Sequence, residues 1–448
     1  MSLRDLYHNK WVRMSFWAIL YLLWVIWLGN YWWLLGLIVI FDHHITRKVK
    51  WMFWKQNLKE GEKRNPWLDW LDAIIFAVVV VTFINIFFFQ AFRIPSSSME
   101  STLFTGDHLF VDKITYGPRT PQTPLTIPFT HNVIFSHESY STLIKNDYKR
   151  LKGIREVRRG DIVVFGFPNG DTVLKKAPAD DYYASVRNSG RQYVIDNFGP
   201  IIVRPTDKKD HYVKRCVAVA GDTLTVKDGL VYVNSVKQEV YPGIQLSYEV
   251  RTTGQKINSK LIDDLKLNTG ELFFDPYLPG YPIMPLTEEM LGKIKSFSSV
   301  ESVKANLDVY PPDYPDSYSS LFPFSPEFEW TRDYYGPLWI PKKGVCVKLT
   351  AHNLPLYRRI ISVYEGNDFQ VSSDGKYIIN GKETDEYTFK QNYYFMMGDN
   401  RHNSLDSRYW GFVPEDHVVG KPFVVWYSSD RNKKFPSNVR WGRFFKFV

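Results

Sequence analysis

The chain has 448 residues and a mass of 52.6 kDa, enough for two or three domains of ordinary size. Its net charge of +9 fits a basic protein near anionic lipid. After residue 92 the sequence has no basic run interleaved with base-stacking aromatics, which argues against nucleic-acid binding. Two cysteines, Cys216 and Cys346, are too few for a metal cluster or a disulfide framework, and they leave open one bridge or two free thiols.

Three apolar segments in residues 1–92 predict a membrane anchor. Residues 73–92 are almost unbroken apolar, and as a helix these 20 residues would extend about 30 Å, the thickness of a bilayer core. Residues 14–29 and 31–41 meet at Gly29 beside aromatic residues of the kind found at membrane interfaces, and they form either one tilted span or a tight hairpin. No small-x-small pattern follows residues 14–29, so we expect a retained anchor and not a cleaved signal peptide.

Charge predicts the orientation of this anchor. Residues 42–70 carry seven basic against four acidic side chains, so the positive-inside rule places this loop in the cytoplasm. Residues 73–92 then lead the chain outward, and everything after Phe92 is expected to be extracytoplasmic. Arg4, Lys10 and Arg13 also prefer the cytoplasm, which favours the hairpin because a single span would leave them outside.

The remainder of the chain is predicted to be mainly β. Short runs of β-branched and aromatic residues alternate with Gly, Asp and Pro, and the best helical pattern is residues 287–296. Residues 120–158, 169–209 and 227–389 look like insertions, the last with an irregular Pro- and Tyr-rich run at 310–330. We therefore expect a core in two parts, 93–226 and 390–448, with 227–389 as an accessory β insertion domain.

Two segments carry candidate chemistry. Three serines in "RIPSSSM" end at Ser98, where a lone serine-rich turn would ordinarily bond only to nearby backbone. Lys214 has apolar neighbours in "HYVKRCVAVAGD"; a strand lysine normally extends to water, but desolvation can lower the pKa of a buried amine until it accepts a proton near neutral pH. His402 and Asp406 suggest a Ser-His-Asp triad, yet no second motif sets a histidine against Ser98.

Four segments in order resemble the sequence blocks of bacterial type I signal peptidases, the membrane-anchored Ser/Lys endopeptidases that remove signal peptides from exported proteins. They are "RIPSSSMESTLFTGDHLFVDKITYG", "RGDIVVFGFP", "YVKRCVAVAGD" and "GDNRHNSLDSRYWGFVPEDHVVGK", which together cover less than a fifth of the chain. The resemblance implies a mainly β extracytoplasmic catalytic domain of the signal-peptidase/LexA-like β fold with a large β insertion. N-terminal transmembrane helices would anchor it in the bacterial plasma membrane as a multi-pass protein.

The resemblance also implies roles for individual residues. Ser98 would be the nucleophile, Lys214 the general base, Ser96 the oxyanion donor together with the Ser98 backbone N–H, and Ser404 the residue that orients the lysine amine. A structural role falls to Arg215, Asp399, Asp406 and Arg408, with Arg215 as an ion-pair partner for one of the carboxylates. The pocket-lining positions correspond to Phe92, Ile94, Met99, Leu103, Tyr212 and Val213.

Substrates and partners follow from the same resemblance. Signal peptides ending in small-x-small motifs would bind extended beside residues 94–96, so the expected partners are exported preproteins and membrane lipid, with no metal, cofactor or nucleic acid. The chain departs from the family pattern at Ser101, where proline is usual, and at Ala218 and Ala220, where glycine and proline are usual. Two other hypotheses remain: a catalytically silent membrane-anchored binding module, and a Ser/Lys peptidase with a non-signal substrate.

Overall fold

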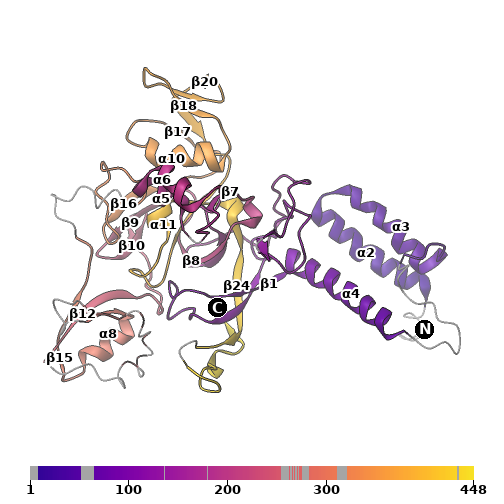
Figure 1. Cartoon of the computed structure of the whole chain (residues 1–448), viewed down its shortest axis with the longest axis horizontal. Coiled ribbons are helices and arrows are strands. Elements are labelled where there is room, and N and C mark those ends of the chain that lie inside the picture. Colours follow the sequence, from indigo (N-terminus) through magenta and orange to yellow (C-terminus); the bar gives the residue numbers. More distant parts are fainter. Residues whose placement is uncertain are drawn as a thin grey trace.

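The computed structural model in Figure 1 shows a helical anchor on one side of a larger β assembly. It describes residues 9–51, 65–135, 137–178, 180–253, 282–309, 320–430 and 433–448, together with 262, 265, 267, 270 and 272–274. Residues 52–64 of the predicted basic loop and residues 310–319 of the Pro- and Tyr-rich run lie outside this set, as do residues 1–8 with Arg4.

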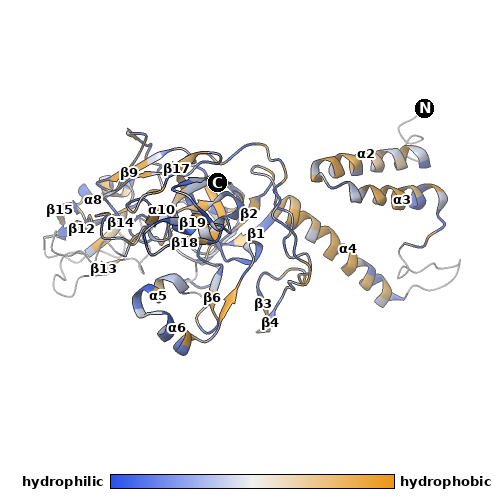
Figure 2. Ribbon diagram, turned by 90° about the horizontal axis from the view of Figure 1, so that it is seen from above, coloured by the Kyte–Doolittle hydropathy of each residue, from blue (hydrophilic) through white to orange (hydrophobic). Residues whose placement is uncertain are grey.

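Helices form the anchor, and Figure 2 colours much of their length as hydrophobic. The elements are α2 (Lys10–Leu28), the 3-10 turn η1 (Tyr31–Leu35), α3 (Gly36–Phe41), the π-helical turn η2 (Asp42–Thr46) and α4 (Pro66–Phe87). Within the described residues, α2 and α4 are long and apolar enough to cross a membrane. Asn65 caps α4 by accepting the Trp67 backbone N–H at 3.1 Å, which explains why this helix begins ahead of the apolar run.

The first two apolar segments form a hairpin. Gly29 has a φ of 61° that lets the chain reverse after α2, and the Asn30 side chain accepts the Trp32 backbone N–H at 3.2 Å. Trp24 and Trp33 then pack with ring centroids 5.7 Å apart. Of the two arrangements that the sequence left open, the structure therefore has the hairpin.

The third apolar segment contains both a helix and a strand. It was expected to be helical over residues 73–92, but α4 ends at Phe87 and β1 (Phe89–Arg93) follows. β1 pairs antiparallel with β2 (Asp107–Asp112), Phe89 opposite Asp112. A continuous apolar run hides this change because aromatic residues suit a strand as well as a membrane helix. The expected boundary at residue 92 thus falls inside a strand.

The central sheet holds most of the segments that carried the family resemblance. Its strand order is β1-β2-β24-β5-β8-β22-β23, with β25 beside β24, and neighbours pair antiparallel. The further strands are β5 (Ile162–Gly166), β8 (His211–Ala218), β22 (Tyr393–Met397), β23 (Val413–Pro414), β24 (Val418–Ser428) and β25 (Lys446–Phe447). One hydrophobic cluster of this sheet includes Leu109 and Val164, and another includes Val163 and Phe165, so β5 packs on both faces.

Residues 227–389 contribute to two different units. A four-stranded sheet of β9 (Thr223–Lys227), β10 (Leu230–Val233), β11 (Val236–Lys237) and β16 (Tyr335–Trp339) shares its core with β8 and β22, for example through Leu338 and Phe395. A second sheet, of β12 (Leu246–Thr252), β13 (Phe273–Phe274), β14 (Pro282–Leu286) and β15 (Val300–Ala305), packs on helix α8 (Glu288–Lys295) around a core of its own. Figure 1 shows this second unit at the end away from the anchor.

Smaller elements complete the surface. Helix α8 confirms the helix expected at residues 287–296. Short helices and hairpins also occur in the stretches interpreted as insertions: α5 (Tyr182–Ser189), α6 (Arg191–Phe198), α10 (Leu354–Arg359), and the strand sets β3 (Val133–Ile134) with β4 (His137–Glu138), β6 (Thr172–Leu174) with β7 (Ile201–Val203), β17 (Cys346–Lys348) with β21 (Glu386–Thr388), and β18 (Phe369–Val371) with β19 (Tyr377–Ile379) and β20 (Lys382–Glu383). Helix α11 (Ser407–Trp410) follows the polar loop near residue 400.

Candidate active site

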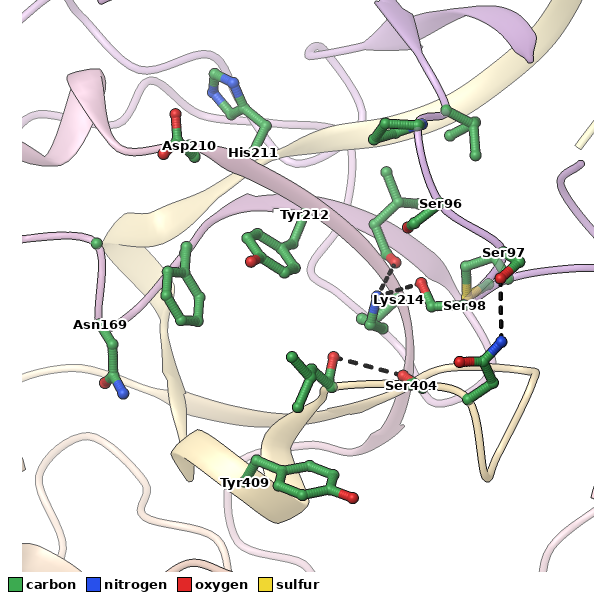
Figure 3. A pocket seen from close by; sticks show the side chains of 18 of the residues that line it. Ser96, Ser97, Ser98, Asn169, Asp210, His211, Tyr212, Lys214, Ser404 and Tyr409 are labelled. Carbon is green, nitrogen blue, oxygen red and sulfur yellow. Dashed lines mark hydrogen bonds between the residues drawn. The ribbon is translucent and has the colours of Figure 1, made fainter. Parts of the chain in front are cut away.

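Ser98 lies in the turn that links β1 to β2. The turn is closed by backbone hydrogen bonds such as Leu103 N–H to Met99 O at 2.7 Å, and both of these side chains are buried in the core. Ile94, which precedes Ser98, is buried in the same core, so the turn is anchored on both sides of Ser98, whose side chain faces the cleft (Figure 3). Ser101 has a φ of 68°, which proline cannot adopt, so this backbone is incompatible with the proline usual in the family.

Lys214 reaches Ser98 from the opposite part of the sheet. Its Nζ lies 2.6 Å from Ser98 Oγ and donates to the Val213 carbonyl oxygen at 3.1 Å (Figure 3). Only 3% of Lys214 is exposed, and burial lowers the pKa of its amine to about 8, although Asp406 and Asp399 act in the opposite direction. The side chain that the sequence suggested could be a base is therefore dry and within hydrogen-bonding distance of the serine.

The catalytic loop, defined as residues 398–404, runs beside the serine turn. The Asn400 backbone N–H donates to Ser98 O at 3.1 Å, and Asn403 Nδ2 donates to Ser97 Oγ at 3.2 Å. A Cβ on Gly398 would lie 2.5 Å from Ser98 O, so only glycine allows this approach. The two asparagine contacts had no signal in the sequence beyond the density of polar residues in this loop.

Ser404 is buried in the same cleft, below Lys214 in Figure 3. In the described structure it makes no hydrogen bond to the lysine amine, and its Oγ donates weakly to Leu405 O at 3.5 Å. Ser404, the residue expected to orient the Lys214 amine, therefore lies in the same cleft but is not hydrogen-bonded to that amine in the described structure.

Two buried ion pairs support the loop. Arg215 binds Asp399 through both carboxylate oxygens, at 2.7 Å from Nε and 2.6 Å from the terminal nitrogen, so the ion pair expected for Arg215 is present. Arg408 binds Asp406 at 2.9 and 2.8 Å in the same way. Burial would raise the pKa of the Asp406 carboxyl, but the charge and hydrogen bonds of Arg408 keep it below its ordinary value. All four side chains are almost fully buried.

A cleft of about 680 Å³ opens at the dyad. Five of the six expected pocket residues line it, together with Ser96: Phe92, Ile94, Met99, Tyr212 and Val213. Leu103, the sixth, is fully buried in the core beneath the serine turn and does not line the cleft. Its place in the turn next to Met99 gave no means of distinguishing a wall residue from a core residue.

His402 has a different partner from the one a triad would need. Its Nε2 lies 2.8 Å from Asp333 Oδ1, and its Nδ1 accepts the Ser247 backbone N–H at 3.0 Å, whereas Asp406 binds Arg408. Both imidazole nitrogens are therefore hydrogen-bonded to groups other than a serine hydroxyl, so His402 does not form a catalytic triad. Asp333 is 69 positions away in the sequence, so no local motif reveals this pair.

The structure also bears on metal binding and on the two thiols. Across the described ranges, no three His, Cys, Asp or Glu side chains are grouped to hold a metal ion. Cys216 is buried and Cys346 exposed, and both are free thiols.

Comparison with known proteins assigns the family. The sequence profile described as "Signal peptidase, peptidase S26" matches residues 67–274 and 348–427, well over half of the chain. Proteins named signal peptidase I are similar over most of their length: one from Haemophilus influenzae is 25% identical, covering 85% of this chain and 75% of the relative. Another from Buchnera aphidicola subsp. Acyrthosiphon pisum is 23% identical, covering 87% and 85%, and one from Helicobacter pylori strain 26695 is 23% identical, covering 85% and 91%. With its mainly β domain behind two candidate apolar helices, the chain belongs to the signal peptidase family, peptidase S26.

Proposed function

We propose that this chain is a type I signal peptidase, a serine endopeptidase that removes signal peptides from exported preproteins after small-x-small motifs. The observation that carries the proposal is the distance of 2.6 Å between Ser98 Oγ and the buried Lys214 amine. A serine hydroxyl is a weak nucleophile until a base takes its proton, and a desolvated lysine can do so without a histidine.

In the proposed reaction, neutral Lys214 accepts the proton of Ser98 as the serine oxygen attacks the scissile carbonyl. The Ser96 hydroxyl and the Ser98 backbone N–H stabilise the negative charge of the tetrahedral intermediate. The lysine ammonium then donates its proton to the departing amine, leaving an acyl-enzyme. Water attacks this ester with Lys214 again as base, which releases the signal peptide and restores Ser98.

The substrate is proposed to bind as an added strand. β1 is an edge strand of the central sheet, and residues 94–96 continue its line along the cleft. Residues 211–213 of β8 line the opposite wall. An extended peptide between the two walls would place alternate side chains in pockets formed by residues such as Ile94, Met99 and Val213, where apolar walls favour small apolar groups.

The proposed topology is multi-pass, with the catalytic domain extracytoplasmic at a bacterial plasma membrane. The hairpin of α2 and α3 returns the chain to the side where the basic residues after Asp42 lie, and α4 leads it across again. We also retain the proposal of a core formed by residues 93–226 and 390–448. Residues 227–389 are then the large insertion, part of which packs into that core.

The test is cleavage of a purified preprotein by the detergent-solubilised full-length protein. Ser98→Ala and Lys214→Ala should each abolish turnover, whereas Ser101→Ala, a serine of the same turn that does not line the cleft, should stay within a few-fold of wild type. Ser96→Ala should lose roughly 3 kcal/mol of transition-state stabilisation, about a hundredfold in kcat. Wild-type turnover by either dyad variant would refute the proposal, and fragmentation of the protein incubated alone would indicate a self-processing peptidase instead.

A further inference from the structure

The insertion contacts the catalytic loop through its backbone. Gln245, next to β12, pairs with Asn400 as a parallel bridge. Its N–H donates to Asp399 O at 2.8 Å, and its carbonyl accepts the Arg401 N–H at 3.0 Å. The residue that directly precedes β12 is therefore paired with the loop that approaches Ser98.

His402 connects the same loop to two further points of the insertion. The Ser247 backbone N–H can only donate, so His402 Nδ1 must accept and the ring proton lies on Nε2. That proton is donated to Asp333, whose two oxygens lie 2.8 and 2.9 Å away. Arg332 also donates to the His402 carbonyl oxygen at 3.0 Å. The imidazole is thus hydrogen-bonded to β12 through one nitrogen and to the segment before β16 through the other.

The environment of this pair favours a fixed geometry. The side chain of His402 is 7% exposed and that of Asp333 is fully buried. Burial would raise the pKa of the Asp333 carboxyl, but hydrogen bonds from His402 and the Asp308 backbone N–H keep it below its ordinary value. If the loop moved away, Asp333 Oδ1 would lose the His402 donor while Oδ2 kept the Asp308 N–H, and a buried oxygen left unpaired in this way is costly.

Asp333 lies in residues 275–347, which the family profile does not match, whereas His402 lies in a matched segment. The His402–Asp333 hydrogen bond therefore joins a segment that matches the family profile to a segment that the profile does not match. It also acts close to the chemistry, because Asn400 binds the Ser98 carbonyl and Ser404 lies in the cleft at the dyad.

We propose that His402 and Asp333 are positioning residues that hold the catalytic loop against the serine turn, making the insertion a structural part of the active site. This inference rests on the proposed peptidase function. The pair acts through the loop: Asp333 lies outside the cleft, and His402, although it lines the cleft, uses both ring nitrogens to bind the insertion and not the dyad. Loosening the loop should let Ser404 and the Asn400 N–H drift, and a displacement of about 1 Å in such supporting groups can cost roughly a hundredfold in rate.

The experiment compares His402→Asn with His402→Gln in the full-length protein. The asparagine oxygen can accept the Ser247 N–H, but its amide nitrogen is too short to reach Asp333, whereas the longer glutamine side chain can place an N–H donor there. His417→Asn is the matched control, since the His417 side chain is 3% exposed and bonded to Asp416 at 2.5 Å but lies outside the catalytic loop. The readouts are kcat per active site titrated by acyl-enzyme burst, KM, and the pH profile of kcat/KM.

For His402→Asn we expect kcat to fall about tenfold or more with KM within about twofold, because the two proposed substrate walls, residues 92–99 and 211–213, are unchanged. The limb of the pH profile should move to higher pH by on the order of one unit as water reaches the lysine amine. His402→Gln should recover part of both losses. His417→Asn should lower thermal stability alone and leave the profile in place.

A folded His402→Asn protein with wild-type kcat and pH profile would overturn the inference and leave the pair as a stabiliser only. If that variant does not fold, the same measurements are made on Asp333→Asn, which removes the charge at nearly constant side-chain volume. Wild-type kcat and an unchanged pH profile in this variant would likewise overturn the inference. Failure of the proposed function is distinguishable, because then the wild-type protein would not cleave or Ser98→Ala would remain active.

Discussion

The pH dependence of cleavage follows directly from the burial of Lys214. Its amine has a pKa lowered from 10.5 to about 8, a destabilisation of the charged form by roughly 3 kcal/mol. Only the neutral amine can accept the serine proton. With a pKa of about 8, the neutral fraction is about 9% at pH 7 and about 90% at pH 9, whereas an amine at 10.5 would be only about 0.03% neutral at pH 7.

We therefore expect kcat/KM to rise about tenfold from pH 7 to pH 9 and then level off. The assay measures initial rates of preprotein cleavage at limiting substrate between pH 6 and 10, with the fraction of folded protein checked at each pH by circular dichroism. Lys214→Arg serves as a control, because a guanidinium stays protonated over this range and should give no turnover at any pH. A flat profile, or a limb centred near 10.5, would refute the assignment of a dry lysine base.

Three further outcomes follow from burial. Arg215→Met should lower the free energy of unfolding by about 3 to 5 kcal/mol, because it leaves a buried carboxylate without its ion-pair partner. Arg251→Met, which breaks a half-exposed ion pair, should lower it by less than about 1 kcal/mol. Equal losses for the two variants in chemical denaturation would contradict this reasoning. Leu103→Ala should lower the free energy of unfolding by about 2 to 5 kcal/mol without changing the preferred cleavage site, which is measured by mass spectrometry of the products. An altered cleavage site would show that Leu103 helps to form the substrate pocket. Cys346 should react rapidly with a maleimide while Cys216 reacts only after unfolding; equal rates in the native protein would contradict the assigned burial.

The sequence predicted those parts of the site that local pattern encodes. Ser98 and Lys214 stood in recognisable segments, and the apolar neighbours of Lys214 already indicated a dry amine. The ion pair of Arg215 was also expected, and the structure supplies Asp399 as its partner. Ser98 and Lys214 were found through segments of a few residues each, whereas the Arg215 ion pair, which spans 184 positions, was implied only by the family resemblance.

What the sequence could not predict depends on contacts between distant segments. Asp333 meets His402 only after the insertion folds back, so the sequence offered no partner for His402 beyond the Asp406 of a triad that it did not support. Leu103 shares the serine turn with Met99 but points into the core, a difference set by packing and not by residue type. The end of α4 was placed too late because hydropathy is alike in a membrane helix and an aromatic strand.

The position of β24 has a consequence for biosynthesis. In the central sheet this strand, Val418–Ser428, is the only link in the described strand order between β2, beside the nucleophile turn, and β5, which pairs with the strand of Lys214. A ribosome must therefore translate nearly the whole message before the two halves of the proteolytic centre can be joined. A nascent or prematurely terminated chain would carry both reactive side chains yet remain harmless to its neighbours at the translocation site.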